Sequence, residues 1–81
     1  MDTELTRNDI VYLRWLDSAL TPEWTKAPNE ETGLSEIETI GYLVFEDATQ
    51  IQVALSRFGK SQFMAIQAIP KSVIIERKKL D

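Results

Sequence analysis

Few side chains in this 81-residue chain combine the types and spacings that catalysis requires. The chain has no histidine and no cysteine, so it lacks the commonest general base, the commonest metal ligand and any thiol chemistry. Glu46 and Asp47 are adjacent carboxylates, but neighbours on a turn do not converge like a catalytic pair. Asp17 could join them around a calcium ion, yet no ligand-loop spacing supports such a site. We therefore expect Glu46 and Asp47 to lie in a solvated turn, with no metal ion bound.

Two lysines stand beside serines, in Lys60-Ser61 and Lys71-Ser72. A serine–lysine hydrolase needs a buried lysine held against its serine, and adjacent residues on a short turn rarely reach that geometry. The chain also has no glycine-rich phosphate loop. The sequence therefore predicts a protein that is not an enzyme and binds no cofactor.

The remaining candidates are binding residues. Trp15 and Asp17 share one face if residues 11–17 form a strand, where they could bind a peptide or a cation. The alternative reading is structural, with the tryptophan capping the core and the aspartate capping the next turn. Trp24 lies in a polar loop, and we expect it to fold back over the open end of the domain, because so small a chain has few apolar residues to spare. Exposure at an interface is the other reading for Trp24.

Basic side chains form the second group of binding candidates, which comprises Lys60, Lys71, Arg77, Lys78 and Lys79. They could contact phosphates or an acidic protein surface, although a short basic tail is also typical of a solubilising end. The net charge is −4 and the isoelectric point about 4.7, which disfavours a general nucleic-acid binder. Residues 1–50 hold 11 acidic and 3 basic side chains, and residues 51–81 hold 2 acidic and 6 basic. This asymmetry permits contact between the acidic half of one copy and the basic half of another.

The elements that must position these residues are strands. Alternating apolar residues and turn signals predict strands over residues 10–18, 37–47, 50–58, 62–70 and 73–80. Gly41 lies inside the second strand, where a glycine marks a sharp bend or a close backbone approach. Pro70 has no N–H and ends its ladder, so Lys71 and Ser72 should form a single 3₁₀ turn. This order predicts one all-β domain over residues 1–81, a small, strongly bent antiparallel barrel with a long loop at 19–36.

The N-terminal part is harder to assign. Residues 1–9 are polar, and we expect them to be frayed. Thr6 to Asp9 resembles a helix capping box, and apolar residues from Ile10 to Leu20 also fit a helical face. The β-branched and aromatic run at 10–12 favours a strand instead. No apolar run approaches the roughly 20 residues of a membrane span, and the N-terminus lacks a secretory signal, so we expect a cytoplasmic protein with no membrane contact.

Short motifs scattered from Val11 to Leu80 resemble a group of small uncharacterised phage and prophage proteins. The motifs are Val11-x-x-x-Trp15-x-Asp17-Ser18, a later Trp24, Ile40-Gly41-Tyr42-Leu43-Val44 with Glu46-Asp47, Ile51-x-Val53-Ala54-Leu55, and Ile69-Pro70-Lys71-x-x-Ile74. That group carries no established activity to transfer. Because its members are mostly β, the resemblance favours a strand at residues 11–17, and it implies the host-cell cytoplasm if the chain is phage-encoded.

A looser likeness is to the Sm-like family of ring-forming RNA-binding barrels. In that family a strand glycine precedes a turn aspartate by six positions, as Gly41 precedes Asp47 here. The family's RNA-binding asparagine follows that aspartate closely, and Ile51 stands in its place; Pro70-Lys71 replaces the Arg-Gly type of second motif. The likeness therefore implies the barrel and a ring of copies, but not the RNA pocket. SH3-like barrels, with a 3₁₀ turn before the last strand, fit equally well.

The first functional hypothesis is a non-enzymatic accessory protein of the phage or prophage type, which acts by assembling with copies of itself or by binding another protein. The last strand is its expected edge for pairing, around Val73–Arg77. The alternative is an Sm-like RNA-binding ring, in which the basic residues form one face and Tyr42 or Phe63 stacks on bases.

Overall fold

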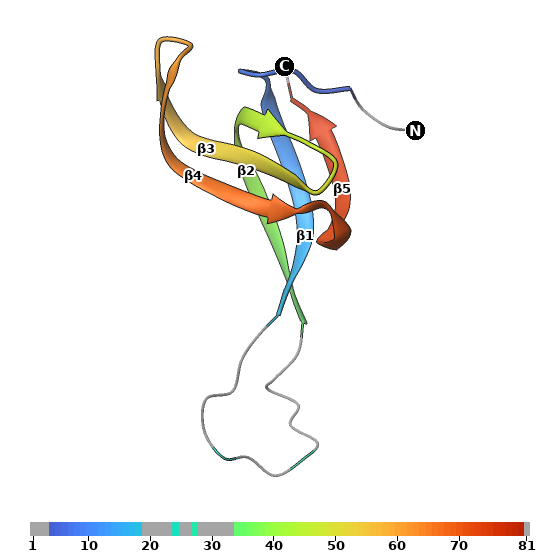
Figure 1. Cartoon of the computed structure of the whole chain (residues 1–81). Helices are drawn as coiled ribbons and strands as arrows, with labels where there is room; N and C mark the ends of the chain where they lie inside the picture. Colours follow the sequence, from blue (N-terminus) through green and yellow to red (C-terminus); the bar gives the residue numbers. More distant parts are fainter. Residues whose placement is uncertain (1–3, 19–23, 25–26, 28–33, 81) are drawn as a thin grey trace.

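The structure is a computed structural model that describes residues 4–18, 24, 27 and 34–80. Its elements are β1 (Ile10–Ser18), β2 (Leu34–Glu46), β3 (Gln50–Phe58), β4 (Gln62–Pro70), the 3₁₀ helix η1 (Lys71–Val73) and β5 (Ile74–Lys79). They form one antiparallel five-stranded sheet in the order β4-β3-β2-β1-β5 (Figure 1). Within the described ranges, no helix is long and apolar enough to cross a bilayer.

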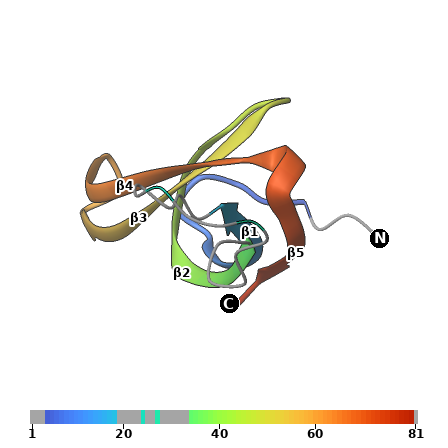
Figure 2. The same ribbon diagram turned by 90° about the horizontal axis from the view of Figure 1, so that it is seen from below.

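The predicted all-β, five-stranded antiparallel architecture is confirmed, and the sheet is open. Its two edges are β4 and β5, which η1 connects by turning the chain sharply between them (Figure 2). Three strands have the predicted bounds. β2 begins three residues early, at Leu34, and ends at Glu46 instead of 47; β5 runs from Ile74 to Lys79 instead of 73–80. The added residues of β2 are exposed, but they continue the ladder with β1 as far as the Ser18–Leu34 pair. Backbone pairing, which the hydrophobic pattern does not record, extends this strand.

The core lies on one face of the sheet. Its buried side chains alternate along the strands, as expected for a sheet with one covered face; they are Val11, Leu13, Trp15, Leu43, Ile51, Val53 and Ile69. Partly buried Val73 and Ile74 pack against this cluster from η1 and the start of β5. The core therefore connects both edge strands to the centre of the sheet.

At Gly41 the backbones of β2 and β3 approach each other closely. A Cβ built on this glycine would lie 2.5 Å from the carbonyl oxygen of Ala54. Real Cβ atoms do not approach a backbone oxygen so closely, and the expected close approach at this glycine is confirmed.

The expectation of a frayed N-terminus is wrong for residues 6–9. The N–H and hydroxyl of Thr6 donate to one carboxylate oxygen of Asp9, at 2.8 and 3.1 Å. The backbone N–H of Asn8 donates to the Leu43 carbonyl, and the N–H of Leu43 donates to the Asp9 carbonyl. Residues 1–3 lie outside the described residues.

The capping-box pattern at Thr6–Asp9 is real, but it precedes a strand. Asn8 has φ 77°, in the left-handed region that asparagine tolerates better than most residues. This residue directs the chain away from a helical path, and the extended residues from Ile10 onwards pair with β2. The helical reading of residues 10–18 is therefore wrong.

Candidate functional site

A β-bulge near the end of β2 turns one carboxylate onto the core face. Leu43 pairs with Val53 and Glu46 pairs with Ile51, but the register shifts between these pairs at Phe45. The extra residue brings Glu46 to the same face as buried Leu43 and Ile51, although strict alternation from Leu43 would place it on the opposite face. Its side chain is 20% exposed.

Glu46 is held by two cations from the far end of the chain. Nη1 and Nη2 of Arg77, on β5, donate to its two carboxylate oxygens at 2.8 and 3.0 Å. The Nζ atom of Lys71, in η1, lies 2.6 Å from Oε2. The hydrogen bonds from Arg77, and then those from Lys71, lower the pKa of Glu46. Glu46 is thus ionised and fully engaged, which makes it a clamp between β2 and β5.

Arg77 reaches Glu46 because it lies opposite Leu13, on the core face of β5. The planar guanidinium fits the carboxylate with two parallel bonds, a geometry that a lysine could not reproduce. Its Nε atom is buried without a hydrogen-bond partner. A buried unpaired N–H is unfavourable, so this arginine is held by the ion pair and its packing.

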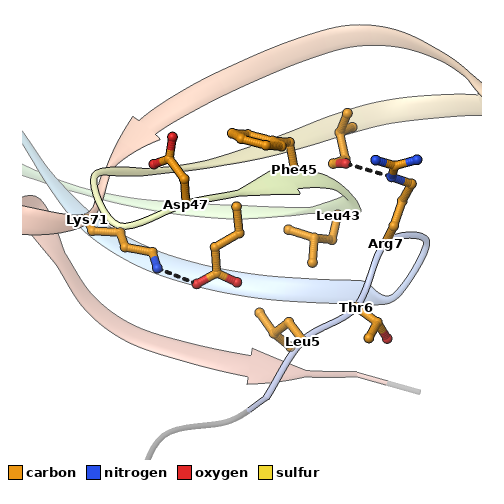
Figure 3. Close-up of a pocket in the computed structure, with 9 residues that line it drawn as sticks. Leu5, Thr6, Arg7, Leu43, Phe45, Asp47 and Lys71 are labelled. Carbon is orange, nitrogen blue, oxygen red and sulfur yellow. Dashed lines mark hydrogen bonds and ion pairs between the residues drawn. The ribbon is translucent and has the colours of Figure 1, made fainter.

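A cleft of about 480 Å³ opens beside this clamp. It is lined by Leu5, Thr6, Arg7, Leu43, Val44, Phe45, Glu46, Asp47 and Lys71. Arg7 and Lys71 lie at its two ends, with Leu5, Leu43 and Phe45 between them (Figure 3). The Nε atom of Arg7 donates to the Val44 carbonyl at 3.1 Å. The cleft therefore combines an apolar middle with polar ends.

Asp47 lines the cleft but is occupied by its own turn. Its Oδ1 atom accepts hydrogen bonds from the N–H and hydroxyl of Thr49, at 2.8 and 2.9 Å, and from the N–H of Gln50 at 3.0 Å. The backbone N–H of Thr49 contributes most to lowering the pKa of Asp47. The expected turn role is confirmed for Asp47 but not for Glu46, which binds Arg77 and Lys71 instead of water.

Glu46 and Asp47 are the two carboxylates that line the cleft. Among residues 4–18, 24, 27 and 34–80, no group of three or more carboxylates lies close enough to hold a metal ion. Glu46 is neutralised by cations, and Asp47 is engaged in a turn. Neither carboxylate is poised as a general base, whose pKa works best near the operating pH. The apolar middle and polar ends of the cleft are compatible with a bound segment that carries both apolar and polar groups.

Of the candidate pair Trp15 and Asp17, the tryptophan has the structural position that was the alternative reading. Trp15 is 8% exposed and belongs to the core, and its indole N–H donates to the Thr39 hydroxyl at 3.0 Å. Asp17 is exposed. Trp24 is fully exposed, so the expectation that it covers the end of the domain is wrong; the residues on either side of it lie outside the described part of the chain.

The predicted basic residues do not gather on one surface. Lys71 and Arg77 converge on Glu46. Lys78 lies 3.1 Å from a carboxylate oxygen of Glu76 and 5.5 Å above the Tyr12 ring, on the opposite face of β5.

Lys79 and Lys60 are separated as well. Lys79 lies 3.7 Å from a carboxylate oxygen of Asp9. Lys60 is exposed in the β3–β4 turn, and its carbonyl accepts a hydrogen bond from the Asn8 amide. Four of the five basic candidates are therefore within ion-pair distance of a carboxylate.

A second surface of interest is the β3–β4 hairpin. Four large apolar side chains on it are exposed, from 50% at Ile66 to 79% at Phe58; the others are Leu55 and Met64. Arg57 on this hairpin lies over the Tyr42 ring at 4.4 Å and donates to the Asn8 side chain. The hairpin therefore presents an apolar surface beside one free edge of the sheet.

Sequence reasoning missed Glu46 as a clamp, and with it the cleft. The bulge that turns Glu46 inward has no signal in the hydrophobic alternation. The Thr6-x-x-Asp9 pattern did mark a hydrogen-bonded turn, and that turn positions Arg7 beside the cleft.

Comparison with protein-family models, curated proteins and solved structures finds no match to this chain.

Proposed function

We propose that this protein is a non-enzymatic assembly module, which acts by joining other chains, and first of all copies of itself, through the edges of its sheet. The observation that supports this proposal most directly is the coincidence of a free edge at β4 with exposed apolar side chains on the β3–β4 hairpin. Free edges carry unpaired backbone groups that another strand can satisfy, and exposed apolar patches mark interaction surfaces.

The architecture that we propose for this role is a small barrel of the SH3-like or Sm-like type. The strand order β4-β3-β2-β1-β5 and the 3₁₀ helix before β5 support it. The Glu46–Arg77 pair also supports it, because this contact joins the end of β2 to the last strand across the core face. In this proposal such a module belongs among phage or prophage accessory proteins, as the resemblance to small phage and prophage proteins suggests, but that resemblance supplies no activity to transfer.

The proposal is tested by the native mass in solution, measured by light scattering on a sizing column over a wide range of protein concentrations. A mass that is a multiple of 9.3 kDa supports self-assembly. A mass of 9.3 kDa at every concentration would refute it and leave only capture of a different protein.

An RNA-binding ring is the weaker candidate. Phosphate contacts need available cations, and four of the five basic candidates already lie beside carboxylates. Fluorescence anisotropy with a labelled single-stranded RNA, at low and at moderate salt, separates the two. Steeply salt-dependent binding would favour the ring over the assembly module.

A further inference from the structure

The two edges of the sheet differ in charge. β4 is nine residues long and has no charged side chain, whereas four of the six residues of β5 are charged. Natural proteins commonly protect an exposed edge with charged side chains, especially lysine, because these oppose the approach of another strand. β5 has this protection and β4 does not. The sequence-based expectation placed the contact between copies, called the joint below, at the last strand. The charge pattern of the two edges indicates β4 instead.

The backbone of β4 shows which of its groups are available. Residues of an antiparallel ladder alternate between those that bond the neighbouring strand and those whose N–H and C=O point away from it. Just beyond β4, the N–H of Lys71 donates to the Thr49 carbonyl, on the β3 side, at 2.9 Å. The β3–β4 pairs on either side of Ala65 keep one register, so the backbone N–H and C=O groups of the odd-numbered residues of β4, apart from Ala65, point towards β3. The even-numbered residues face the free edge, namely Gln62, Met64, Ile66, Ala68 and Pro70.

Pro70 agrees with this assignment. A proline within a strand is tolerated where its missing N–H would face outward, and Pro70 lies at such an even-numbered position, opposite Gln50. Ala65, with φ 58°, is the one β4 residue in the left-handed region. The N–H of Ala65 and the C=O of Met64 belong to one peptide plane, so this φ changes the direction of both groups, and the ladder has no Leu55–Ala65 pair.

The side chains along this edge are apolar and uncovered. Met64 is 71% exposed and Ile66 is 50% exposed. Met64 and Ile66 are even-numbered residues at the free edge. A strand added at this edge would therefore lie directly beside their side chains. Cross-strand apolar pairs stabilise a sheet by about 0.2–1 kcal/mol each. An added strand would therefore satisfy the backbone groups and cover the exposed side chains together.

The strand that fits this edge best is β4 of a second copy. Pairing β4 with the β5 edge of another copy would bring two net basic regions together, since residues 51–81 hold 6 basic and 2 acidic side chains. Antiparallel pairing of β4 with itself brings only uncharged side chains into contact. It also places the basic hairpin end of each copy, with Arg57 and Lys60, towards the Pro70 end of the other, where Asp47 lies without an ion-pair partner among the described residues.

We propose that two copies of this chain form a symmetric dimer through antiparallel β4–β4 pairing, with Ile66 opposite Ile66 of the second copy. In this register Met64 lies opposite Ala68, and Gln62 lies opposite Pro70, so the whole of β4 is paired. A two-fold axis through Ile66 makes the contact closed, because each copy uses the same surface. This inference rests on the proposed function and specifies which edge and which symmetry carry out the assembly.

The first test compares the same substitution on the two edges. Ile66→Lys places two cations opposite each other at the axis and should reduce the native mass from twice 9.3 kDa to 9.3 kDa. Ile75→Lys is the matched control on β5, where the isoleucine is 47% exposed, and it should leave the dimer intact. Circular dichroism checks that both variants fold. If Ile75→Lys dissociates the assembly and Ile66→Lys does not, the β4 joint is refuted while self-assembly stands.

Ala68→Pro tests the backbone without adding charge. The N–H of residue 68 faces the free edge, so a proline there should leave the ladder with β3 intact and remove one bond to the second copy. We expect the dimer to dissociate at concentrations where the unmodified chain remains dimeric. A folded Ala68→Pro variant with unchanged dimer affinity would contradict the proposal.

Amide hydrogen exchange, measured residue by residue by NMR, gives an independent readout. The N–H groups of Met64, Ile66 and Ala68 should exchange quickly in the monomer and become protected as concentration rises. The N–H of Leu80 donates to the Ile10 carbonyl, so by the same alternation Arg77 faces the outer edge of β5; its amide should remain fast. Protection appearing at Arg77 instead would move the joint to β5.

The register is tested by introducing a single cysteine. Because the chain has no cysteine of its own, any crosslink must form at the introduced residue. Directly opposite residues of a hydrogen-bonded antiparallel pair have Cα atoms about 5.5 Å apart, and their Cβ atoms are farther apart than the roughly 3.5–4.5 Å of a disulfide. A short bifunctional thiol reagent should therefore convert Ile66→Cys to a covalent dimer, and Ile75→Cys should stay largely uncrosslinked. An Ile66→Cys variant that remains dimeric but is not crosslinked would refute this register.

Discussion

Replacing Gly41 by alanine adds only one methyl group, but it should lower the free energy of unfolding far more than so small a change suggests. The added Cβ would lie 2.5 Å from the Ala54 carbonyl oxygen and 3.3 Å from its carbon. A carbon and a carbonyl oxygen in sheets are normally about 3.3–3.6 Å apart, so β3 must retreat by about 0.8–1 Å. The neighbouring Tyr42–Ala54 pair is part of the β2–β3 ladder, and a shift of this size stretches its hydrogen bonds beyond useful length.

The magnitude follows from two contributions. Overpacking typically costs about 1–3 kcal/mol, and one weakened ladder bond adds about 1 kcal/mol. We therefore expect Gly41→Ala to lose about 2–4 kcal/mol. A domain of this size has roughly 4–12 kcal/mol of total stability, so the variant should fold only marginally.

Urea unfolding followed by tryptophan fluorescence measures this loss. Trp15 is 8% exposed and reports on the core, whereas Trp24 is already exposed in the folded chain. The control is Gly59→Ala, where the φ of +64° is unfavourable for alanine but no atom lies within 4 Å of the new Cβ. It should lose only about 1 kcal/mol. If Gly41→Ala loses no more than Gly59→Ala, the steric argument is wrong.

Three further predictions concern the clamp, the strained strand and the core. Glu46→Gln should lower stability by about 1–2 kcal/mol at neutral pH. Because the folded pKa of Glu46 is lowered, its contribution is present above the usual value of 4.5 and is lost as pH falls through the folded pKa; thermal melts from pH 7 to 3 should fall less steeply in the variant. Ala65→Gly should leave stability unchanged or raise it by up to about 1 kcal/mol, whereas Ala65→Val should lower it by about 1–2 kcal/mol in urea, because φ is 58° there. Thr39→Val leaves the indole N–H of Trp15 unpaired and should cost about 1–2 kcal/mol, with a shift in tryptophan emission; an unchanged melt would show that water replaces the hydroxyl.

The strands and corners were predictable because their signals are local. Alternating apolar residues determined β3 and β4, β4 ended at Pro70 as expected, and Asp47 formed the expected turn. Each of these signals depends on the period of a strand or on the hydrogen bonding of one side chain.

The candidate site could not be predicted, because it depends on distant residues and on one inserted residue. The bulge after Leu43 reverses the expected direction of Glu46, and only the folded sheet brings Arg77 within reach. The N-terminal segment was judged by its polar composition, whereas its order comes from backbone bonds to Leu43. Trp24 was expected to cover the open end of the domain because apolar residues are few in so small a chain, but it is exposed.

The position of β1 between β2 and β5 has a consequence for how the chain folds. Arg14 on β1 and Glu76 on β5 are hydrogen-bonded but lie 62 positions apart in the sequence. Closing a loop of that length costs about 3–4 kcal/mol of chain entropy, whereas the β2–β3 and β3–β4 turns bring neighbouring strands together at small cost. The three-stranded meander β2–β3–β4 should therefore form first, and β5 should dock after the transition state. Destabilising substitutions on β5 should then mainly accelerate unfolding, whereas those in the β2–β3 turn should slow folding.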